Sequence, residues 1–275
     1  MMPPTSPLLP PEKRIPFFRS ARFDILLFII VLLLSGLVFH LLMDSGEAQY
    51  PWDWETVPQY IITHADGHWQ AGPLLQGLGI TLKIAAVSLV GAFFVGLVTA
   101  LLRRSDAPAA RFLATLYLEV SRNTPLLIQI FFIYFVLGPV LGINRFWAAV
   151  LSLSCFDGAY AAEIFRSGIE SVGRGQFEAA KSLGLSPWIT WRKVIIPLAL
   201  RKVLPPLASQ SISLVKDSAL VGAIAIFDLT QQGKMIIADT YLTFEIWLVV
   251  GAIYIVITAV LSLTVSVIES RVRLQ

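Results

Sequence analysis

The sequence predicts an all-α polytopic membrane protein with about six transmembrane helices. Hydrophobic residues make up 56% of the chain and charged residues only 14%, whereas a soluble globular domain carries about 25% charged residues. The mean hydropathy is +0.73. The apolar residues are gathered into runs long enough to cross a bilayer, which takes about 20 helical residues. Together these three observations favour a membrane protein over a soluble enzyme or binding domain.

Six apolar segments are predicted to span the membrane. Their approximate ranges are 24–43, 78–102, 112–140, 146–168, 194–226 and 244–268. The first is longer than a signal-peptide core and lacks a small-residue cleavage site, so we predict a retained span. The third and fifth exceed what a bilayer requires, and each is predicted to hold a tilted or broken helix. The candidate breaks are Pro125 and the pair Pro205-Pro206, because proline interrupts helical hydrogen bonding.

The distribution of Lys and Arg predicts the orientation of these spans. Sixteen of the 21 Lys and Arg residues fall on one side, and only Arg145 and Lys234 fall on the other. Cytoplasmic segments are enriched in Lys and Arg, so we predict that both termini and the segment after the fourth span are cytoplasmic. The net charge of +3 follows this topology and does not indicate nucleic-acid binding. The Pro-rich residues 1–23 are predicted to be a disordered cytoplasmic tail.

The segment between the first two spans is predicted to be a solvated outer connection. Residues 44–76 contain no Lys or Arg, five acidic residues and three tryptophans, which typically lie at the lipid headgroup layer. His64, Asp66 and His68 do not predict a metal site, because their spacing is loose and no further ligands converge on them. The single cysteine, Cys155, lies within a span, so no disulfide framework is expected within the chain.

The polar segment between the fourth and fifth spans carries the most specific pattern. Glu178-Ala179-Ala180 is followed by Gly184 and then by Val194-Ile195-Ile196-Pro197. Phe177, Ala180 and Leu183 are predicted to share one apolar face of a helix, with Glu178 and Lys181 facing water. Gly184 is predicted to end this helix in the left-handed conformation. Ser186-Pro187 is predicted to begin the next helix, with Ser as its N-cap.

This pattern resembles the EAA loop of ATP-binding-cassette (ABC) importers, whose membrane subunits use it to dock on a separate ATPase. Other stretches resemble permeases for polar amino acids, of the histidine, glutamine, glutamate and arginine type. They are Thr81-Leu82, Ser121-Arg122-Asn123-Thr124-Pro125-Leu126-Leu127-Ile128-Gln129, Tyr160–Ile169, Leu204-Pro205-Pro206 and Lys216-Asp217-Ser218-Ala219-Leu220. The resemblance implies a type I ABC importer transmembrane domain over residues 73–270, with a cytoplasmic coupling helix in the EAA loop at 174–197. Residues 24–72 are then an extra transmembrane helix and outer segment, and 271–275 a cytoplasmic C-terminal tail.

The resemblance also implies the partners of this chain. They are ABC ATPase subunits, a second permease subunit (identical or sister), an extracytoplasmic amino-acid-binding protein and the lipid of a cell inner membrane. The residues expected to couple to the ATPase are Glu178, Ala179, Ala180, Gly184 and Pro197. ATP and Mg are expected on the partner ATPase, because the phosphate-binding pattern Gly-x-x-x-x-Gly-Lys-Ser/Thr is absent here. No catalytic residue, metal or cofactor is therefore expected on this chain, and amino-acid transport rather than enzymatic chemistry is its expected activity.

Charged residues within the spans are candidates for the substrate pathway, since charge at membrane depth is costly and usually functional. Asp157 in the fourth span is a candidate for holding the ammonium group of an amino acid, or else is a carboxylate that packs helices and is satisfied by a neighbouring Ser, Tyr or Lys. Glu163 and Arg166 lie three residues apart, so a structural pair is favoured over substrate contact. Lys216 and Asp217 point different ways around a helix and are expected to line a cavity or to pair with other helices.

Backbone groups and small residues add two further expectations. Arg122, Asn123 and Thr124 precede Pro125, where a helix break is expected to expose carbonyl groups on the pathway side of the bundle. Ala92, Gly96 and Ala100 recur at four-residue spacing, which is typical of close helix packing rather than of a binding site.

Three other interpretations remain open from the sequence. An ion-coupled secondary transporter is disfavoured because no inverted repeat is recognisable. A non-transporting sister or scaffold subunit would share the same helices without a solute site. An ABC importer permease for another small solute, such as methionine, phosphonate or a metal, would also carry the EAA loop.

Overall fold

A computed structural model describes residues 21–44, 50–65 and 68–273. The chain forms two compact units, residues 1–52 and 53–275. The first unit contains α1 (Ala21–Asp44), a helix whose described side chains between residues 26 and 37 are apolar or small and exposed. Most of the predicted N-terminal tail lies outside the described residues, as do Asp66 and the last two residues of the predicted C-terminal tail.

The second unit is built around the contact between α3 (Pro73–Arg103) and α7 (Arg145–Glu170), the most extensive helix contact in the chain. Small residues bring the two backbones close together. A Cβ atom at Gly96 would lie 2.7 Å from the Cβ atom of Ala161 and 3.0 Å from the carbonyl oxygen of Gly158. Ala92 and Ala100 are buried on the same face of α3. The predicted packing role of this small-residue stripe is confirmed.

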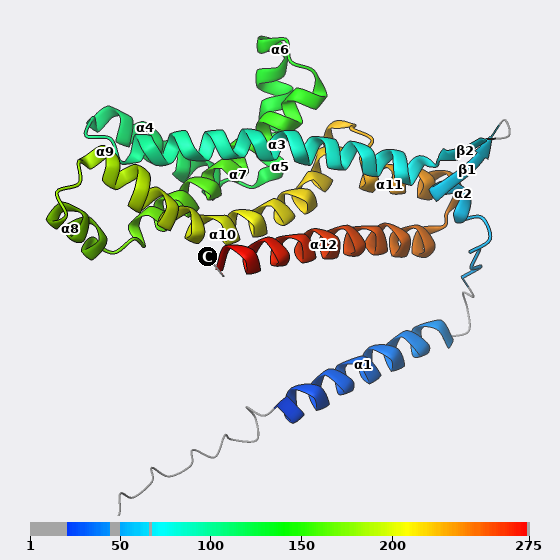
Figure 1. Cartoon of the computed structure of the whole chain (residues 1–275). Helices are drawn as coiled ribbons and strands as arrows, with labels where there is room; N and C mark the ends of the chain where they lie inside the picture. Colours follow the sequence, from blue (N-terminus) through cyan, green and yellow to red (C-terminus); the bar gives the residue numbers. More distant parts are fainter. Residues whose placement is uncertain (1–20, 45–49, 66–67, 274–275) are drawn as a thin grey trace, which may run out of the picture. The chain divides into compact units, whose positions relative to one another are not determined.

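The helices α10 (Ile196–Asp217), α11 (Leu229–Thr240) and α12 (Thr243–Arg273) belong to the same bundle (Figure 1). The helix α10 packs against α7, α3 and α12, and the short α11 packs against α3 and α12. A 3₁₀ stretch, Ser218–Ile224, links α10 to α11. Asp228 begins α11 as an N-cap that accepts hydrogen bonds from the backbone of Thr230 and Gln231.

The predicted break at Pro125 is confirmed. The helix α4 (Pro108–Asn123) ends before it, and α5 (Leu126–Phe131) begins after it. The chain then continues through a π-helical stretch, Phe132–Leu137, into α6 (Gly138–Leu141), and the two halves are bent by 112°. Figure 1 shows α6 projecting away from the other helices of this unit. The third predicted span is therefore two helices at a steep angle.

The predicted break at Pro205-Pro206 is wrong. Both prolines lie within α10, which continues unbroken to Asp217. A proline removes only its own N–H donor, and packing of α10 against α7 and α12 holds the helix across the pair. The irregular turns instead lie at the two ends of α10, where a π-helical stretch, Trp191–Ile195, precedes it and the 3₁₀ stretch follows it.

The segment before α3 folds back on the bundle as a β-hairpin. A short helix, α2 (Pro58–Ile61), leads into β1 (Ile62–Ala65), which pairs antiparallel with β2 (His68–Ala71). The buried carboxylate of Glu245, in the first turn of α12, accepts a hydrogen bond of 2.9 Å from the backbone of Asp53. Figure 1 places this hairpin at the opposite end of α3 from α8 and α9. The sequence reasoning did not identify these strands.

Among the described residues, three helices are long and apolar enough to cross a membrane by themselves: α3, α7 and the first 25 residues of α12. The bent pair of α4 and α5–α6 adds a fourth if it counts as one span. The helix α10 is not among them, because Arg201, Lys202 and its Pro, Ser and Gln residues lower its mean hydropathy. That α1 and α10 also span the membrane stays a prediction.

Replacing Gly96 by Leu is expected to destabilise the chain, because the new side chain would meet α7. Overpacking of this kind costs about 1–3 kcal/mol of unfolding free energy. Gly79→Leu is the matched control, since Gly79 lies on the same helix with nothing within 4 Å of its Cβ position. Thermal unfolding of the detergent-solubilised chain measures both variants. Equal melting temperatures would contradict the assignment of α3–α7 as the central contact.

Candidate functional site

The EAA loop (residues 174–197) lies at the end of the bundle where α3 ends (Figure 1). Its first helix, α8 (Arg174–Ser182), ends in the geometry that the sequence predicts. Gly184 has φ +71, and the backbone N–H of Leu185 donates to the carbonyl oxygen of Ala180 at 3.1 Å. This is a Schellman-type end, in which a glycine takes the left-handed conformation.

The second helix of the EAA loop, α9 (Pro187–Thr190), also begins as predicted. The Ser186 hydroxyl accepts a hydrogen bond from the backbone of Ile189, and Pro187 occupies the first turn, where its missing N–H is not needed. The chain then enters the π-helical stretch and α10, with Pro197 near the start of α10. The loop is therefore a defined helix–turn–helix.

The EAA loop presents apolar side chains to solvent. Leu183 is 77% exposed and Trp188 is 72% exposed. Large exposed apolar side chains that lie close together on a surface often mark an interaction site. The prediction that Leu183 shares one apolar helix face with Phe177 and Ala180 is wrong. Ala180 is buried and Phe177 is half-buried, but α8 ends at Ser182, and Leu183 at its C-cap lies beyond the packed face.

Glu178 and Ala179 are exposed on α8. Phe177 contacts the indole of Trp191 edge-to-face at 5.9 Å between ring centroids, and both pack against the cluster of Val172, Ile195 and Ala199. One side of α8 is thus fixed to the helix bundle, while the other side, together with Leu183 and Trp188, remains free for a partner protein.

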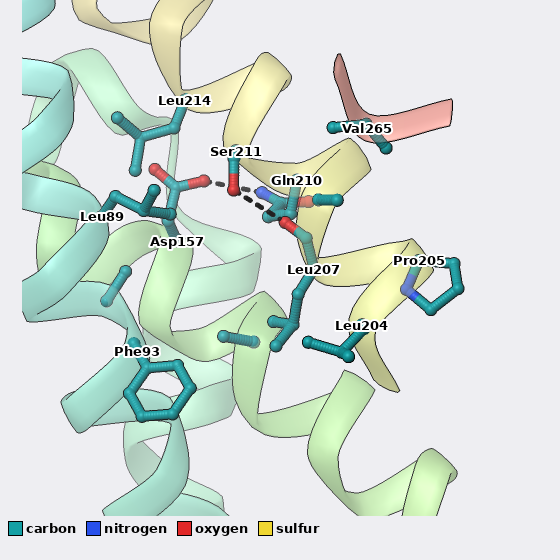
Figure 2. A pocket seen from close by; sticks show the side chains of 13 residues that line it. Leu89, Phe93, Asp157, Leu204, Pro205, Leu207, Gln210, Ser211, Leu214 and Val265 are labelled. Atoms are coloured by element: carbon teal, nitrogen blue, oxygen red, sulfur yellow. Dashed lines mark hydrogen bonds between the residues drawn. The ribbon is translucent and has the colours of Figure 1, made fainter. Parts of the chain in front are cut away.

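A second candidate site is a cavity of about 300 Å³ between α3, α7, α10 and α12 (Figure 2). Its wall is largely apolar, and its polar groups are Asp157 from α7 with Gln210 and Ser211 from α10. The Gln210 amide donates to Asp157 Oδ1 at 2.6 Å, whereas the Ser211 hydroxyl donates to the carbonyl oxygen of Leu207 within its own helix. Asp157 therefore dominates the polarity of this cavity.

Asp157 is 1% exposed, and its Oδ2 atom has no hydrogen-bond partner among the described residues. Burying a carboxylate with one oxygen unsatisfied is costly unless a donor or a cation compensates it. The partner of Oδ1 is Gln210, and not one of the Ser, Tyr or Lys side chains that the sequence suggested. Gly158 beside it does not open the backbone to the cavity, because Val95 and Tyr117 fill the space at its Cβ position.

A third cluster of charges surrounds Glu163 on α7. Its carboxylate pairs with Arg103 at the end of α3 and with Arg166 on its own helix, and it lies 3.7 Å from the guanidinium of Arg122 on α4. Arg166 also pairs with Glu170 at 2.6 Å. The predicted pair of Glu163 and Arg166 is confirmed, and it belongs to a larger network that joins α3, α4 and α7.

The expectation that the break at Pro125 exposes backbone carbonyls is wrong for Thr124, whose carbonyl oxygen is hydrogen-bonded within the chain. The side-chain amide of Gln129 donates to the carbonyl oxygens of Ser121 and Thr124 at 2.8 and 3.1 Å. Asn123 donates to Glu119 on its own helix at 2.9 Å. Gln129 therefore replaces the lost helical hydrogen bonds from within the chain, as membrane depth requires.

Lys216 and Asp217 do not find partners on other helices within the part of the chain that the structure describes. Lys216 is exposed at the last turn of α10, and Asp217 is half-buried there. The predicted pathway residues thus lie in separate places. Asp157 lines the cavity, and Glu163 and Arg122 belong to the charge network. Lys216 and Asp217 lie at the C-terminal end of α10. Within the described ranges, no group of three or more His, Cys, Asp or Glu could hold a metal ion.

Sequence reasoning missed Gln210, Gln129 and Arg103 as members of these sites. Gln129 belongs to the stretch Ser121–Gln129 that resembles the permeases. Its position four residues after Pro125 is the signal that it can bond the carbonyl groups at the end of α4. Gln210 and Arg103 are polar residues at helix positions that face α7, and only the helix arrangement identifies their partners.

Residues 92–274 match the family described as the binding-protein-dependent transport system inner membrane component. The glutamine transport system permease protein GlnP of Escherichia coli (strain K12) is 41% identical over 210 residues, covering 75% of this chain and 96% of that protein. The arginine transport system permease protein ArtQ of Bacillus subtilis (strain 168) is 35% identical over 202 residues, covering 73% of this chain and 92% of that protein.

Two solved structures share the fold of this chain. A crystal structure of an amino acid ABC transporter with histidines is 39% identical with a TM-score of 0.68, covering 72% of this chain and 94% of that chain. An inward-facing structure of the MetNI methionine ABC transporter has a TM-score of 0.63 at 22% identity, covering 73% of this chain and 96% of that chain. The second likeness concerns the fold alone.

Glu163→Gln is expected to destabilise the helix bundle, because the guanidinium groups of Arg103 and Arg166 would lose their shared counter-charge. Hydrogen bonds to charged groups contribute about 1.5–3 kcal/mol each, and partial exposure places the expected loss of unfolding free energy near the lower figure. Thermal unfolding in detergent measures the loss. Glu119→Gln is the control, since Glu119 is exposed and holds only Asn123. A Glu163 variant as stable as this control would contradict a structural role for the network.

Proposed function

The chain belongs to the family of binding-protein-dependent transport system inner membrane components, and on this premise we propose that it is the permease subunit of an ATP-driven importer of polar amino acids. Relatives that cover about three quarters of the chain are named as glutamine and arginine permeases. The 39%-identical structural neighbour is an amino acid ABC transporter. Its place in a membrane follows from the family and from the apolar helices α3, α7 and α12.

The observation that carries the proposal is the form of the EAA loop. It is a rigid helix–turn–helix at one end of the bundle, packed on one side through Phe177 and Trp191 and open on the other at Leu183 and Trp188. Exposed large apolar side chains on an ordered segment are typical of a protein interface. In the proposed importer this surface docks on the ATPase subunit, with Glu178, Ala179, Ala180, Gly184 and Pro197 as the coupling residues.

The proposed topology places both termini and the EAA loop in the cytoplasm of a cell inner membrane. It rests on the excess of Lys and Arg on that side of the chain. The β-hairpin then lies on the outer side, where an extracytoplasmic amino-acid-binding protein delivers solute. Residues 73–270 form the permease core, and residues 24–72 add a transmembrane helix and the outer segment.

The proposed mechanism is alternating access between two permease subunits, identical or sister. ATP and Mg bind to the partner ATPase subunits, whose closure moves the EAA loops and turns the helices α3, α7 and α10 outward. Hydrolysis then resets them. This chain supplies no catalytic residue and holds no cofactor of its own. Its contribution is to convert the movement of the EAA loop into a change of the helix bundle.

We assign the solute contact to Asp157. Its Oδ2 atom is buried without a partner among the described residues, at the wall of a cavity of about 300 Å³ that lies between four helices. A primary ammonium group carries donors and a positive charge, which is the complement that a buried carboxylate lacks. Every amino acid has such a group, so this contact fits the whole solute class.

The proposed function is tested by uptake of radiolabelled glutamine, arginine, histidine and glutamate in cells with and without this chain. We expect deletion to abolish uptake of at least one of them, and ATP depletion to do the same in intact cells. Unlabelled acidic, basic, amide and aliphatic amino acids, added as competitors, identify the solute. Unchanged uptake of all polar amino acids would overturn the amino-acid assignment.

Gly184→Val is expected to uncouple transport while leaving the chain in the membrane. A β-branched residue in the left-handed conformation costs about 1–2 kcal/mol, so the turn between α8 and α9 would open and misplace the docking surface. A loss of this size corresponds to a fall in uptake of about tenfold. Gly175→Val is the control, because Gly175 lies near the start of α8, has no left-handed φ and has open space around its Cβ position. Equal uptake by the two variants would contradict the docking assignment.

Asp157→Asn is expected to lower uptake by about 10- to 100-fold, the range that loss of one charge-assisted hydrogen bond implies. Asn keeps the size of the side chain and an oxygen for Gln210, so the helices should remain packed. Ser211→Ala is the control, because Ser211 lines the same cavity but its hydroxyl is satisfied within α10. Normal uptake by Asp157→Asn would leave Asp157 with a packing role only.

A further inference from the structure

Two adjacent arginines at the end of α3 contact different parts of the molecule. Arg103 pairs with Glu163 on α7, and Arg104, the C-cap residue of α3, places its guanidinium over the indole of Trp191 at 5.6 Å from the ring centroid. Neighbouring residues on a helix point about 100° apart, which allows one helix end to contact both elements. The end of α3 therefore lies between the helix that carries Asp157 and the EAA loop.

Trp191 is one of the residues through which the EAA loop packs against the bundle. It begins the π-helical stretch between α9 and α10, and its ring contacts Phe177 of α8 edge-to-face. A π-helical turn is an irregularity that often marks a functional hinge. Arg104, Trp191 and Phe177 thus form a continuous series of contacts from the end of α3, through the π-helical stretch, to α8.

The end of α3 is also linked, through α7, to the cavity. Arg103 fixes the end of α3 to Glu163, which lies on α7 about 9 Å along the helix axis from Asp157. The small-residue contact at Gly96 also keeps α3 and α7 closely packed. A displacement of the EAA loop that reaches α3 would therefore also displace α7 and the wall of the cavity.

We propose that Arg104, through its cation–π contact with Trp191, is the positioning residue that transmits movement of the EAA loop to α3 and α7. Among the described residues Arg104 forms no ion pair, so its guanidinium is available to the ring. The contact lies at the surface, where such an interaction is moderate in strength and can change during a transport cycle. This inference rests on the proposed function.

The test uses the transporter complex isolated through a tag on this chain and reconstituted in phospholipid vesicles with its binding protein. Uptake of the radiolabelled amino acid that the cell assay identifies and release of inorganic phosphate from ATP are measured together. The variants are Arg104→Gln, Arg104→Lys, Trp191→Leu and the double variant Arg104→Gln/Trp191→Leu. Arg111→Gln is the control, because Arg111 is an exposed arginine on α4 and lies on the same predicted side of the membrane.

We expect Arg104→Gln to lower the ratio of amino acid taken up to ATP hydrolysed by about two- to fivefold. This factor corresponds to the loss of one exposed cation–π contact. Arg104→Lys should restore most of this ratio, since an ammonium group also binds an aromatic face. Trp191→Leu should lower the ratio at least as much, and the double variant no further than Trp191→Leu alone, because both changes remove one contact. Arg111→Gln should match the unmodified complex.

An unchanged ratio in Arg104→Gln would overturn the inference, and so would additive effects in the double variant. A parallel fall of uptake and ATP hydrolysis, with less complex recovered, would also overturn it, because that result indicates a role in folding or assembly alone. These outcomes differ from failure of the proposed function. In that case the unmodified complex itself would show no ATP-dependent uptake of any of the four labelled amino acids.

Discussion

The close contact of α3 with α7 is the constraint on which the rest of the second unit depends. Gly96 and the alanines around it let the two backbones approach until a single added Cβ atom would collide. In a membrane, lipid and apolar side chains are equally favourable surroundings, so helices associate through this kind of packing rather than through the hydrophobic effect. The two helices form a closely packed pair. The cavity lies on one side of it, and the Glu163 network closes it at the end nearest the EAA loop.

The Glu163 network and the Asp157 cavity both adjoin the α3–α7 pair, but their charged groups differ in how completely they are paired within the chain. The charges around Glu163 are paired within the chain, and three helices meet there. The carboxylate of Asp157 is only half satisfied, by Gln210 from α10. A fully paired network fixes geometry, whereas an unsatisfied buried group favours binding of a complementary ligand. The paired charges therefore lie near the EAA loop, and the unsatisfied carboxylate lies at the cavity between α3, α7, α10 and α12.

Much of the helix arrangement could be predicted from the sequence, because bilayer-length apolar runs, Pro125 and Gly184 act locally. The failures concern residues whose outcome depends on contacts across the fold. Pro205-Pro206 did not break α10, since packing on two sides outweighs two lost hydrogen bonds. Leu183 is exposed because its helix ends one residue earlier, and no single-sequence pattern distinguishes an apolar residue kept for a partner from one buried in the chain. Gln210 could be matched to Asp157 only once α7 and α10 were placed side by side.

The polar groups left without partners show where the chain must meet something else. At membrane depth a charged side chain needs a counter-charge, a polar cavity or water. Arg103, Arg122 and Arg166 obtain theirs from Glu163, whereas Lys216 and Asp217 at the end of α10 obtain none from other helices in the described part of the chain. If α10 spans the membrane, these two charged groups require polar surroundings rather than lipid at that end of the helix.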